Sequence, residues 1–145
     1  MLFGKRERLI QRILVVEDEP LVAFDNEHLL GEAGYEVVAT VDSLEDARAV
    51  IESEEKIDLV LTDISLSGEG DGTDVARIAG GRGIPVLFVS GACPEGAQSL
   101  AVGCLSKPYS EKVMKAALDC LDEVLQGNEV KKLPPQLSLY ERAAG

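Results

Sequence analysis

The fold is decided by the stretch Ile13-Leu-Val-Val-Glu-Asp-Glu-Pro20. Its apolar residues follow one another without alternation, as expected of a strand that is covered on both faces of a parallel sheet. Acidic residues end this strand, and Pro20 suits the first turn of a helix. A strand, an acidic turn and a helix in this order indicate the start of a βαβ unit.

The same alternation of apolar strands and amphipathic helices continues along the chain. The sequence predicts strands at Ile13–Val16, Val37–Thr40, Ile57–Thr62, Pro85–Val89 and Cys104–Ser106. It predicts helices at Pro20–Ala33, Asp42–Ile51, Thr73–Gly81 and Ser110–Leu125. Between Gly91 and Gly103, glycine and proline leave room for only one or two helical turns. We therefore expect an α/β fold: a three-layer sandwich with a five-stranded parallel sheet, flavodoxin-like strand order 2-1-3-4-5 and a shortened fourth helix.

Length and composition favour one globular domain without a membrane segment. The chain has 145 residues, of which 46% are apolar and 28% charged. Since no apolar run approaches the roughly 20 residues needed to cross a bilayer, we expect a cytoplasmic protein. The formal net charge of -12, with no basic cluster, predicts no nucleic acid partner. We divide the chain into an N-terminal extension (1–10), one domain (11–126) and a C-terminal tail (127–145), with no output domain.

The cysteines suggest neither a disulfide framework nor a zinc site. Cys93, Cys104 and Cys120 are odd in number and include no CxxC pair. We expect reduced, buried thiols.

Polar residues collect at the predicted strand ends. Glu17 and Asp18 close the first strand, and Asp63, Ser90 and Lys107 follow the third, fourth and fifth strands. Ligands of open parallel sheets bind beyond the carboxyl ends of the strands, so we expect these side chains to converge.

This set of residues suits phosphoryl transfer. Carboxylates that converge require a cation, and oxygen-only ligands favour Mg²⁺, Mn²⁺ or Ca²⁺, of which Mg²⁺ is the natural choice. Asp63 can act as the nucleophile, while Lys107 and Ser90 offer a positive charge and a hydroxyl donor to the phosphoryl oxygens. Simpler interpretations stay open: Asp63 as a turn cap, Lys107 as a surface residue, and Ser90 bonded to the local backbone.

The sequence resembles the receiver domain of response regulators from bacterial two-component systems. The residues that carry the resemblance are Ile13–Pro20, Asp58–Ile64, Asp71–Ala76, Val86–Ser90 and Leu105–Tyr109. The resemblance implies that Asp63 is the phosphoacceptor and that Lys107 and Ser90 bind the phosphoryl group. It also implies that Asp18, Asp63 and the backbone carbonyl of Ser65 bind Mg²⁺, with Glu17 acting through water. A histidine kinase or phosphotransfer protein is the implied donor.

Some positions depart from the family pattern. Cys104 stands where an aromatic residue is usual, and the interval from Ser90 to Lys107 is short. Ser67 replaces a common Pro, and the following loop is longer by one residue. Since the fourth helix contributes to dimers in many relatives, we expect a monomer or a weak dimer.

A more specific resemblance concerns Phe88–Ala92, which is similar to the Phe-Ala-Thr-Gly motif of an alphaproteobacterial subgroup rich in stand-alone receivers. The small residues Ser65 and Ala92 would leave space for water beside an acyl phosphate. We therefore hypothesise fast self-dephosphorylation.

The expected function is signalling through a phosphorelay, a phosphate sink or protein–protein interaction. The chain would not be a conventional enzyme, because it would catalyse only its own phosphorylation and dephosphorylation. Alternatives are a haloacid-dehalogenase-type phosphatase, which has an Asp-x-Asp pattern near the first strand, a flavin or nucleotide carrier, and a pseudo-receiver that only binds proteins. We interpret His28 as a helix surface residue and Tyr109 as a packing residue.

Overall fold

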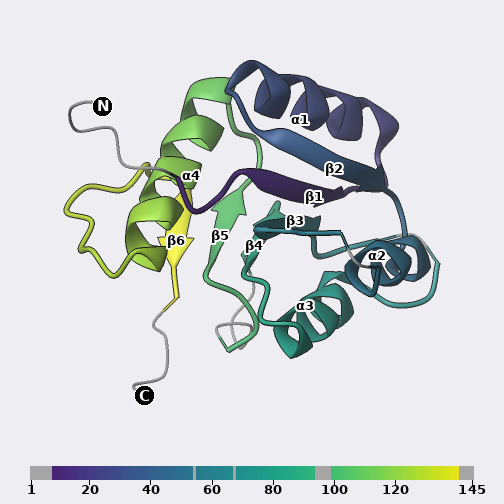
Figure 1. The fold of residues 1–145 in the computed structure, drawn as a ribbon. Helices are drawn as coiled ribbons and strands as arrows, with labels where there is room; N and C mark the ends of the chain where they lie inside the picture. The colour runs from purple at the N-terminus through teal and green to yellow at the C-terminus, as the bar shows by residue number, and fades with distance from the viewer. Residues whose placement is uncertain (1–7, 54, 67, 94–98, 141–145) are drawn as a thin grey trace.

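The computed structural model describes residues 8–53, 55–66, 68–93 and 99–140. Helices cover both faces of one central sheet (Figure 1). The order β2-β1-β3-β4-β5 and the parallel pairing of these strands confirm the predicted α/β sandwich and its flavodoxin-like order. The five strands are β1 (Arg12–Val16), β2 (Glu36–Val41), β3 (Leu59–Asp63), β4 (Val86–Ser90) and β5 (Gly103–Ser106).

Within the described residues, the helices form two pairs on opposite faces of the sheet. α1 (Pro20–Glu32) and α4 (Glu111–Leu125) cover one face, and α2 (Leu44–Ile51) and α3 (Gly72–Gly81) cover the other (Figure 1). α4 is the helix that the sequence predicts after the fifth strand. Serine side chains cap two helices, because Ser43 accepts the backbone N–H of Asp46 and Ser110 accepts that of Val113.

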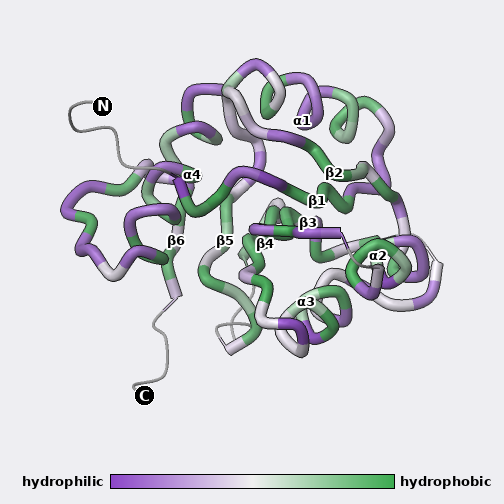
Figure 2. The backbone as a smooth tube through the Cα atoms, viewed as in Figure 1, coloured by the Kyte–Doolittle hydropathy of each residue, from purple (hydrophilic) through white to green (hydrophobic). Residues whose placement is uncertain are grey.

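The core consists of two hydrophobic layers separated by the sheet. Ile13 and Val15 pack in the layer beneath α1 and α4, whereas Leu14 and Val16 pack in the layer beneath α2 and α3. Because successive side chains of β1 enter opposite core layers, every position of its run is apolar. Along the helices, hydrophobic and hydrophilic residues alternate, as expected of elements with one face on the sheet (Figure 2).

The sheet contains a strand beyond the five that the sequence predicts. β6 (Leu137–Leu139) pairs antiparallel with β5, so the described part of the chain has a six-stranded sheet. β6 follows Pro134 and Pro135 and has only three residues, too few for the alternating hydrophobic pattern that would predict a strand. Gly103 permits the close approach, because a Cβ there would lie 2.6 Å from the carbonyl oxygen of Ser138.

The segment between β4 and β5 differs from the other connections. The short helix predicted there falls partly on residues 94–98, which lie outside the described residues. Residues 91–93 and 99–102 are not helical. In the part of the chain that the structure describes, no helix has both the length and the apolar character needed to span a bilayer.

The prediction of three reduced cysteines is wrong for two of them. Cys93 and Cys104 form a disulfide, with their Cα atoms 6.0 Å apart. The parallel pairing of β4 with β5 brings the loop after β4 next to β5, a proximity that cysteine spacing alone does not reveal. Cys120 is a free, half-buried thiol.

Candidate functional site

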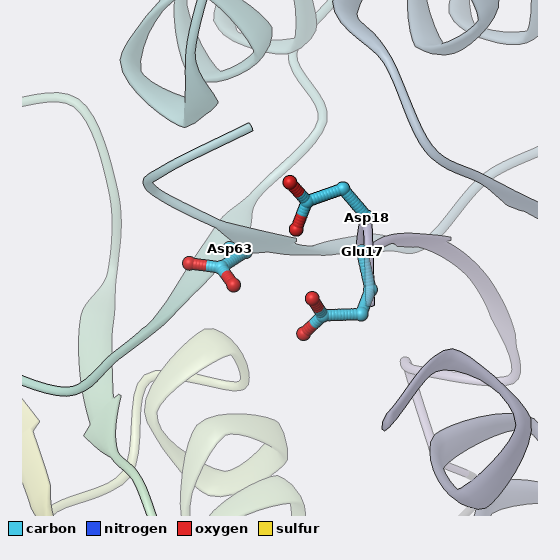
Figure 3. Close-up of side chains that lie close together, drawn as sticks. All are labelled: Glu17, Asp18 and Asp63. Atoms are coloured by element: carbon cyan, nitrogen blue, oxygen red, sulfur yellow. The ribbon is translucent and has the colours of Figure 1, made fainter. Parts of the chain in front are cut away.

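Three acidic side chains meet at the carboxyl ends of β1 and β3. Glu17 and Asp18 directly follow β1, and Asp63 is the last residue of β3 (Figure 3). The two strands are neighbours, with Val16 in register with Thr62, so Glu17 and Asp63 follow paired positions. One oxygen from each carboxylate lies within 4.8 Å of the others. Since their negative charges repel at this spacing, the group suits a bound cation.

Glu17 is an almost fully buried carboxylate, with 3% of its surface exposed. Its Oε2 accepts the backbone N–H of Glu19 at 3.1 Å, and its Oε1 accepts a hydrogen bond from Lys107 at 3.0 Å. Burial raises the pKa of Glu17, as does the charge of Asp63, while the two hydrogen bonds act in the opposite direction. The side chain is therefore held in place by donors on both oxygens.

Lys107 connects the end of β5 to the acidic group. Its Nζ lies 2.7 Å from Asp63 Oδ2 and 3.0 Å from Glu17 Oε1. The backbone N–H of Lys107 donates to the carbonyl of Ser90, which fixes the lysine beside β4. Burial lowers the pKa of Lys107, but the hydrogen bonds and charges of Asp63 and Glu17 outweigh burial and raise it above its usual value. The side chain is thus an ammonium ion at neutral pH.

Asp63 is held from two sides and remains partly accessible. Its Oδ2 accepts from Lys107, and its Oδ1 accepts the backbone N–H of Ser65 at 3.2 Å. The exposed fraction of the Asp63 side chain is 12%, while Ser65 lies on the surface. A carboxylate fixed beside an ammonium group and still reachable from solvent can act as a nucleophile towards a phosphorus atom.

Ser90 adopts the simpler of its two predicted roles in this structure. The residue lies at the end of β4, as predicted, but its hydroxyl donates to the carbonyl of Ala92 at 2.9 Å and accepts the N–H of Ala92 at 3.2 Å. Within the described residues, the hydroxyl therefore bonds to the following loop and not to Asp63.

Gly72, which is not among the predicted site residues, supports the site. Its N–H donates to the carbonyl of Ile64 at 2.7 Å, and a Cβ at this position would lie 2.2 Å from the carbonyl oxygen of Asp63. The start of α3 can approach the end of β3 only because residue 72 has no side chain. Asp71 and Asp74 form a capping box on either side of Gly72, and this pair is the sequence signal that indicates the start of α3.

Two further residues from the sequence analysis have clear positions. Tyr109 is more than a packing residue, because its hydroxyl donates to Oδ1 of the buried Asn26 at 2.6 Å and so links the segment before α4 to α1. Burial raises the pKa of Tyr109. His28 lies on the exposed surface of α1, stacked on Phe24 and 3.8 Å from a carboxylate oxygen of Glu32.

Comparisons with known proteins identify the class that this fold and acidic group define. The sequence model described as the response regulator receiver domain matches residues 13–119. The chain belongs to this family.

Solved structures and a curated relative agree with this assignment. A response regulator receiver protein from Sinorhizobium medicae is 31% identical, with a TM-score of 0.68 over 77% of this chain and 94% of that chain. The receiver domain of sensor histidine kinase PA1611 from Pseudomonas aeruginosa, which has a magnesium ion coordinated in its active-site cleft, is 26% identical, with a TM-score of 0.66 over 76% of this chain and 95% of that chain.

The phyllosphere-induced regulator PhyR from Methylorubrum extorquens is 28% identical over 111 residues, which are 73% of this chain and 41% of PhyR. The chain thus spans less than half the length of this curated relative.

Proposed function

We propose that this chain is a phosphoacceptor in which Asp63 receives a phosphoryl group from a phosphohistidine of a histidine kinase or phosphotransfer protein. The observation that carries the proposal is the position of Lys107 Nζ, 2.7 Å from Asp63 Oδ2 and 3.0 Å from Glu17 Oε1. In this arrangement the Asp63 carboxylate provides the attacking oxygen, and Lys107 provides a positive charge that stabilises the transferred phosphoryl group.

The donor atoms fit Mg²⁺, which prefers carboxylate and carbonyl oxygens. Asp18, Asp63 and the backbone carbonyl of Ser65 would hold the ion, with Glu17 acting through water. When bound, Mg²⁺ would supply positive charge that offsets the charge of the transferred group.

In the proposed step, a carboxylate oxygen of Asp63 attacks the phosphorus atom. The new O–P bond forms as the P–N bond of the phosphohistidine breaks, and its electron pair stays on the imidazole nitrogen. Lys107 stabilises the negative charge of the phosphoryl oxygens. The Ser90 hydroxyl, released from Ala92, would then donate to one of these oxygens. In this proposal the chain is not a conventional enzyme, because it acts only on its own Asp63.

The test is incubation with Mg²⁺ and phosphoramidate, followed by intact mass measurement. The native chain should gain one phosphoryl group, and Asp63→Asn should gain none. Asp25→Asn, an exposed position on α1, is the matched control and should be labelled like the native chain. An unmodified native chain, or equal labelling of Asp63→Asn, would refute the proposal.

We further propose a cytoplasmic signalling role through proteins and not through nucleic acid. Leu21 and Phe24, which are 80% and 68% exposed, lie on α1, the helix that begins beside the acidic group. They provide apolar contact area for a donor protein. The net charge of -12 disfavours DNA. A relay, a phosphate sink and an activated binding partner all agree with this arrangement.

A second candidate is a module that binds a partner without phosphorylation. This chain is also similar to a PhyR from Bartonella quintana that is described as an anti-anti-sigma factor, and this similarity favours a role in protein binding. The two functions separate in one measurement: a phosphorylation-independent module would bind its partner equally as the native chain and as Asp63→Asn. The contact between Lys107 and Asp63 favours the phosphoacceptor function over this second candidate.

A further inference from the structure

A covalent link joins the loop after β4 to β5, close to two residues of the proposed phosphorylation site. Cys93 lies three positions after Ser90, and Cys104 lies three positions before Lys107. Their disulfide therefore connects the residues that follow the hydroxyl group with the strand that carries the lysine.

The two sulfur atoms differ in their access to solvent. Cys104 is 0% exposed and packs in the core layer beneath α2 and α3. Cys93 is only half-buried, and its Sγ lies 3.7 Å from the Ser106 hydroxyl at the end of β5. A small oxidant or reductant would thus reach Cys93 before Cys104.

The disulfide restrains the part of the loop that holds Ser90. The Ser90 hydroxyl bonds to both the carbonyl and the N–H of Ala92, the residue directly before Cys93. To donate to a phosphoryl group on Asp63, this hydroxyl must leave the Ala92 carbonyl. Because Cys93 is tied to buried Cys104, the backbone of Ala92 has less freedom to move in the disulfide form than in the dithiol form.

We propose that Cys93 and Cys104 are a redox modification site, at which oxidation by a peroxide holds Ser90 on Ala92 and slows phosphorylation of Asp63. The inference rests on the proposed function, both for the role of Asp63 and for the cytoplasmic location. Disulfides in a reducing compartment are commonly transient and redox-sensing, which favours a switch over a permanent structural link.

Hydrogen peroxide is the two-electron oxidant that converts the two thiols into the disulfide. The Cys93 thiolate attacks one oxygen of hydrogen peroxide, so the O–O bond breaks and Cys93 becomes a sulfenic acid, with one water released after proton transfer. The Cys104 thiolate then attacks the Cys93 sulfur, forming the S–S bond and releasing the second water. Two thiols are oxidised and one peroxide is reduced. A dithiol reductant reverses the step by thiol–disulfide exchange.

The test uses the full chain with Cys120→Ser, which removes the free thiol as a source of intermolecular disulfides. Reduced protein is treated with hydrogen peroxide, and thiols are counted by alkylation and intact mass. Initial phosphorylation rates with Mg²⁺ and phosphoramidate are then compared for the oxidised and reduced forms, together with hydrogen exchange of the Ala92 amide. Cys93→Ser is the control variant, and Cys104→Ala is a second one that also lacks the link.

We expect the oxidised form to lose both free thiols, to be phosphorylated about ten-fold more slowly and to exchange the Ala92 amide about ten-fold more slowly, with dithiothreitol restoring both rates. In neither variant should peroxide slow phosphorylation or the exchange of the Ala92 amide, because neither can form the disulfide, although Cys93 of Cys104→Ala still forms a sulfenic acid. Failure to form the disulfide, or equal rates and equal exchange in both forms, would overturn the redox site. If neither form is phosphorylated, the proposed function is wrong. The exchange rate of the Ala92 amide then tests by itself whether the disulfide restrains the loop after β4.

Discussion

Lys107 balances the charge of two carboxylates at the scale of single residues. It contacts Asp63 and Glu17, and both the hydrogen bonds and the charges keep the lysine protonated. Glu17 in turn is buried, so its negative charge depends on the neighbouring ammonium group. Lys107 therefore contributes to the stability of the fold and also to the proposed phosphoryl transfer.

Replacing Lys107 by Met should affect both properties. Without the ammonium group, the carboxylates of Glu17 and Asp63 repel each other and the pKa of Glu17 rises further. We expect the free energy of unfolding to fall by about 1–3 kcal/mol, measured in urea. The rate of phosphorylation by phosphoramidate should fall about 100-fold. Lys112→Met makes the same change at an exposed position of α4 and should leave both values unchanged. A native rate in Lys107→Met would contradict the assigned role.

At the scale of elements, the start of α3 shapes the end of β3. Asp71 caps α3, and Gly72 places the first turn against the Asp63 carbonyl. The sequence predicted a helix start at Thr73, one residue after the observed first residue Gly72, because the polar residues that cap a helix act locally. It did not reveal the contact between Gly72 and Asp63, because that contact depends on the path of the chain between the two elements.

Gly72→Ala tests whether this close contact positions Asp63. The new Cβ would meet the Asp63 carbonyl oxygen at 2.2 Å, so β3 and α3 must separate. We expect a loss of about 1–3 kcal/mol in unfolding free energy and a slower phosphorylation of Asp63. In the same helix, Gly80→Ala meets no atom within 4 Å and should stabilise the chain by up to about 1 kcal/mol, with unchanged phosphorylation. Equal behaviour of the two variants would argue against the contact.

The cap at Asp71 should make stability depend on pH. Hydrogen bonds from the Thr73 hydroxyl and from the N–H groups of Asp74 and Thr73 lower the pKa of Asp71 below its ordinary value of 3.8, against a smaller opposing effect of burial. A lowered pKa means that the charged cap stabilises the fold above this value and that the contribution is lost as pH falls through the folded-state pKa.

Asp71→Ala should therefore cost about 1 kcal/mol at neutral pH, and the difference from the native chain should shrink at pH values below 3.8. Urea unfolding at both pH values measures this, with Glu69→Ala as an exposed control. A difference that stays constant with pH would show that the charge of Asp71 does not act as the cap.

The whole molecule is an α/β sandwich in which the pairing of distant segments completes the sheet. The order of β1 to β5 could be predicted because apolar runs alternate with helical periodicity. β6 and the disulfide could not, since both depend on segments that meet only after folding. The convergence of Glu17, Asp63 and Lys107 could be predicted, because the carboxyl ends of parallel strands meet at one edge of the sheet. The hydrogen bonds of Ser90 to Ala92 could be identified only in the structure.

Gly103→Ala tests how β6 is held on the sheet. The added Cβ would meet the Ser138 carbonyl oxygen at 2.6 Å and force β6 away from β5. We expect faster hydrogen exchange of the Tyr140 amide, which donates to the Val102 carbonyl, and a loss of about 1–3 kcal/mol in stability. Gly31→Ala on α1, with no atom within 4 Å, is the control. Unchanged exchange at Tyr140 would mean that β6 tolerates the side chain.

We propose that the acidic group with Lys107 directs a phosphoryl group to Asp63. The most direct measurement locates that group: the chain is incubated with Mg²⁺ and phosphoramidate, reduced with borohydride, which converts an aspartyl phosphate to homoserine, and sequenced by mass spectrometry. We expect homoserine at position 63 and none when Mg²⁺ is chelated. An unmodified Asp63, or a phosphoryl group found on His28 instead, would contradict it.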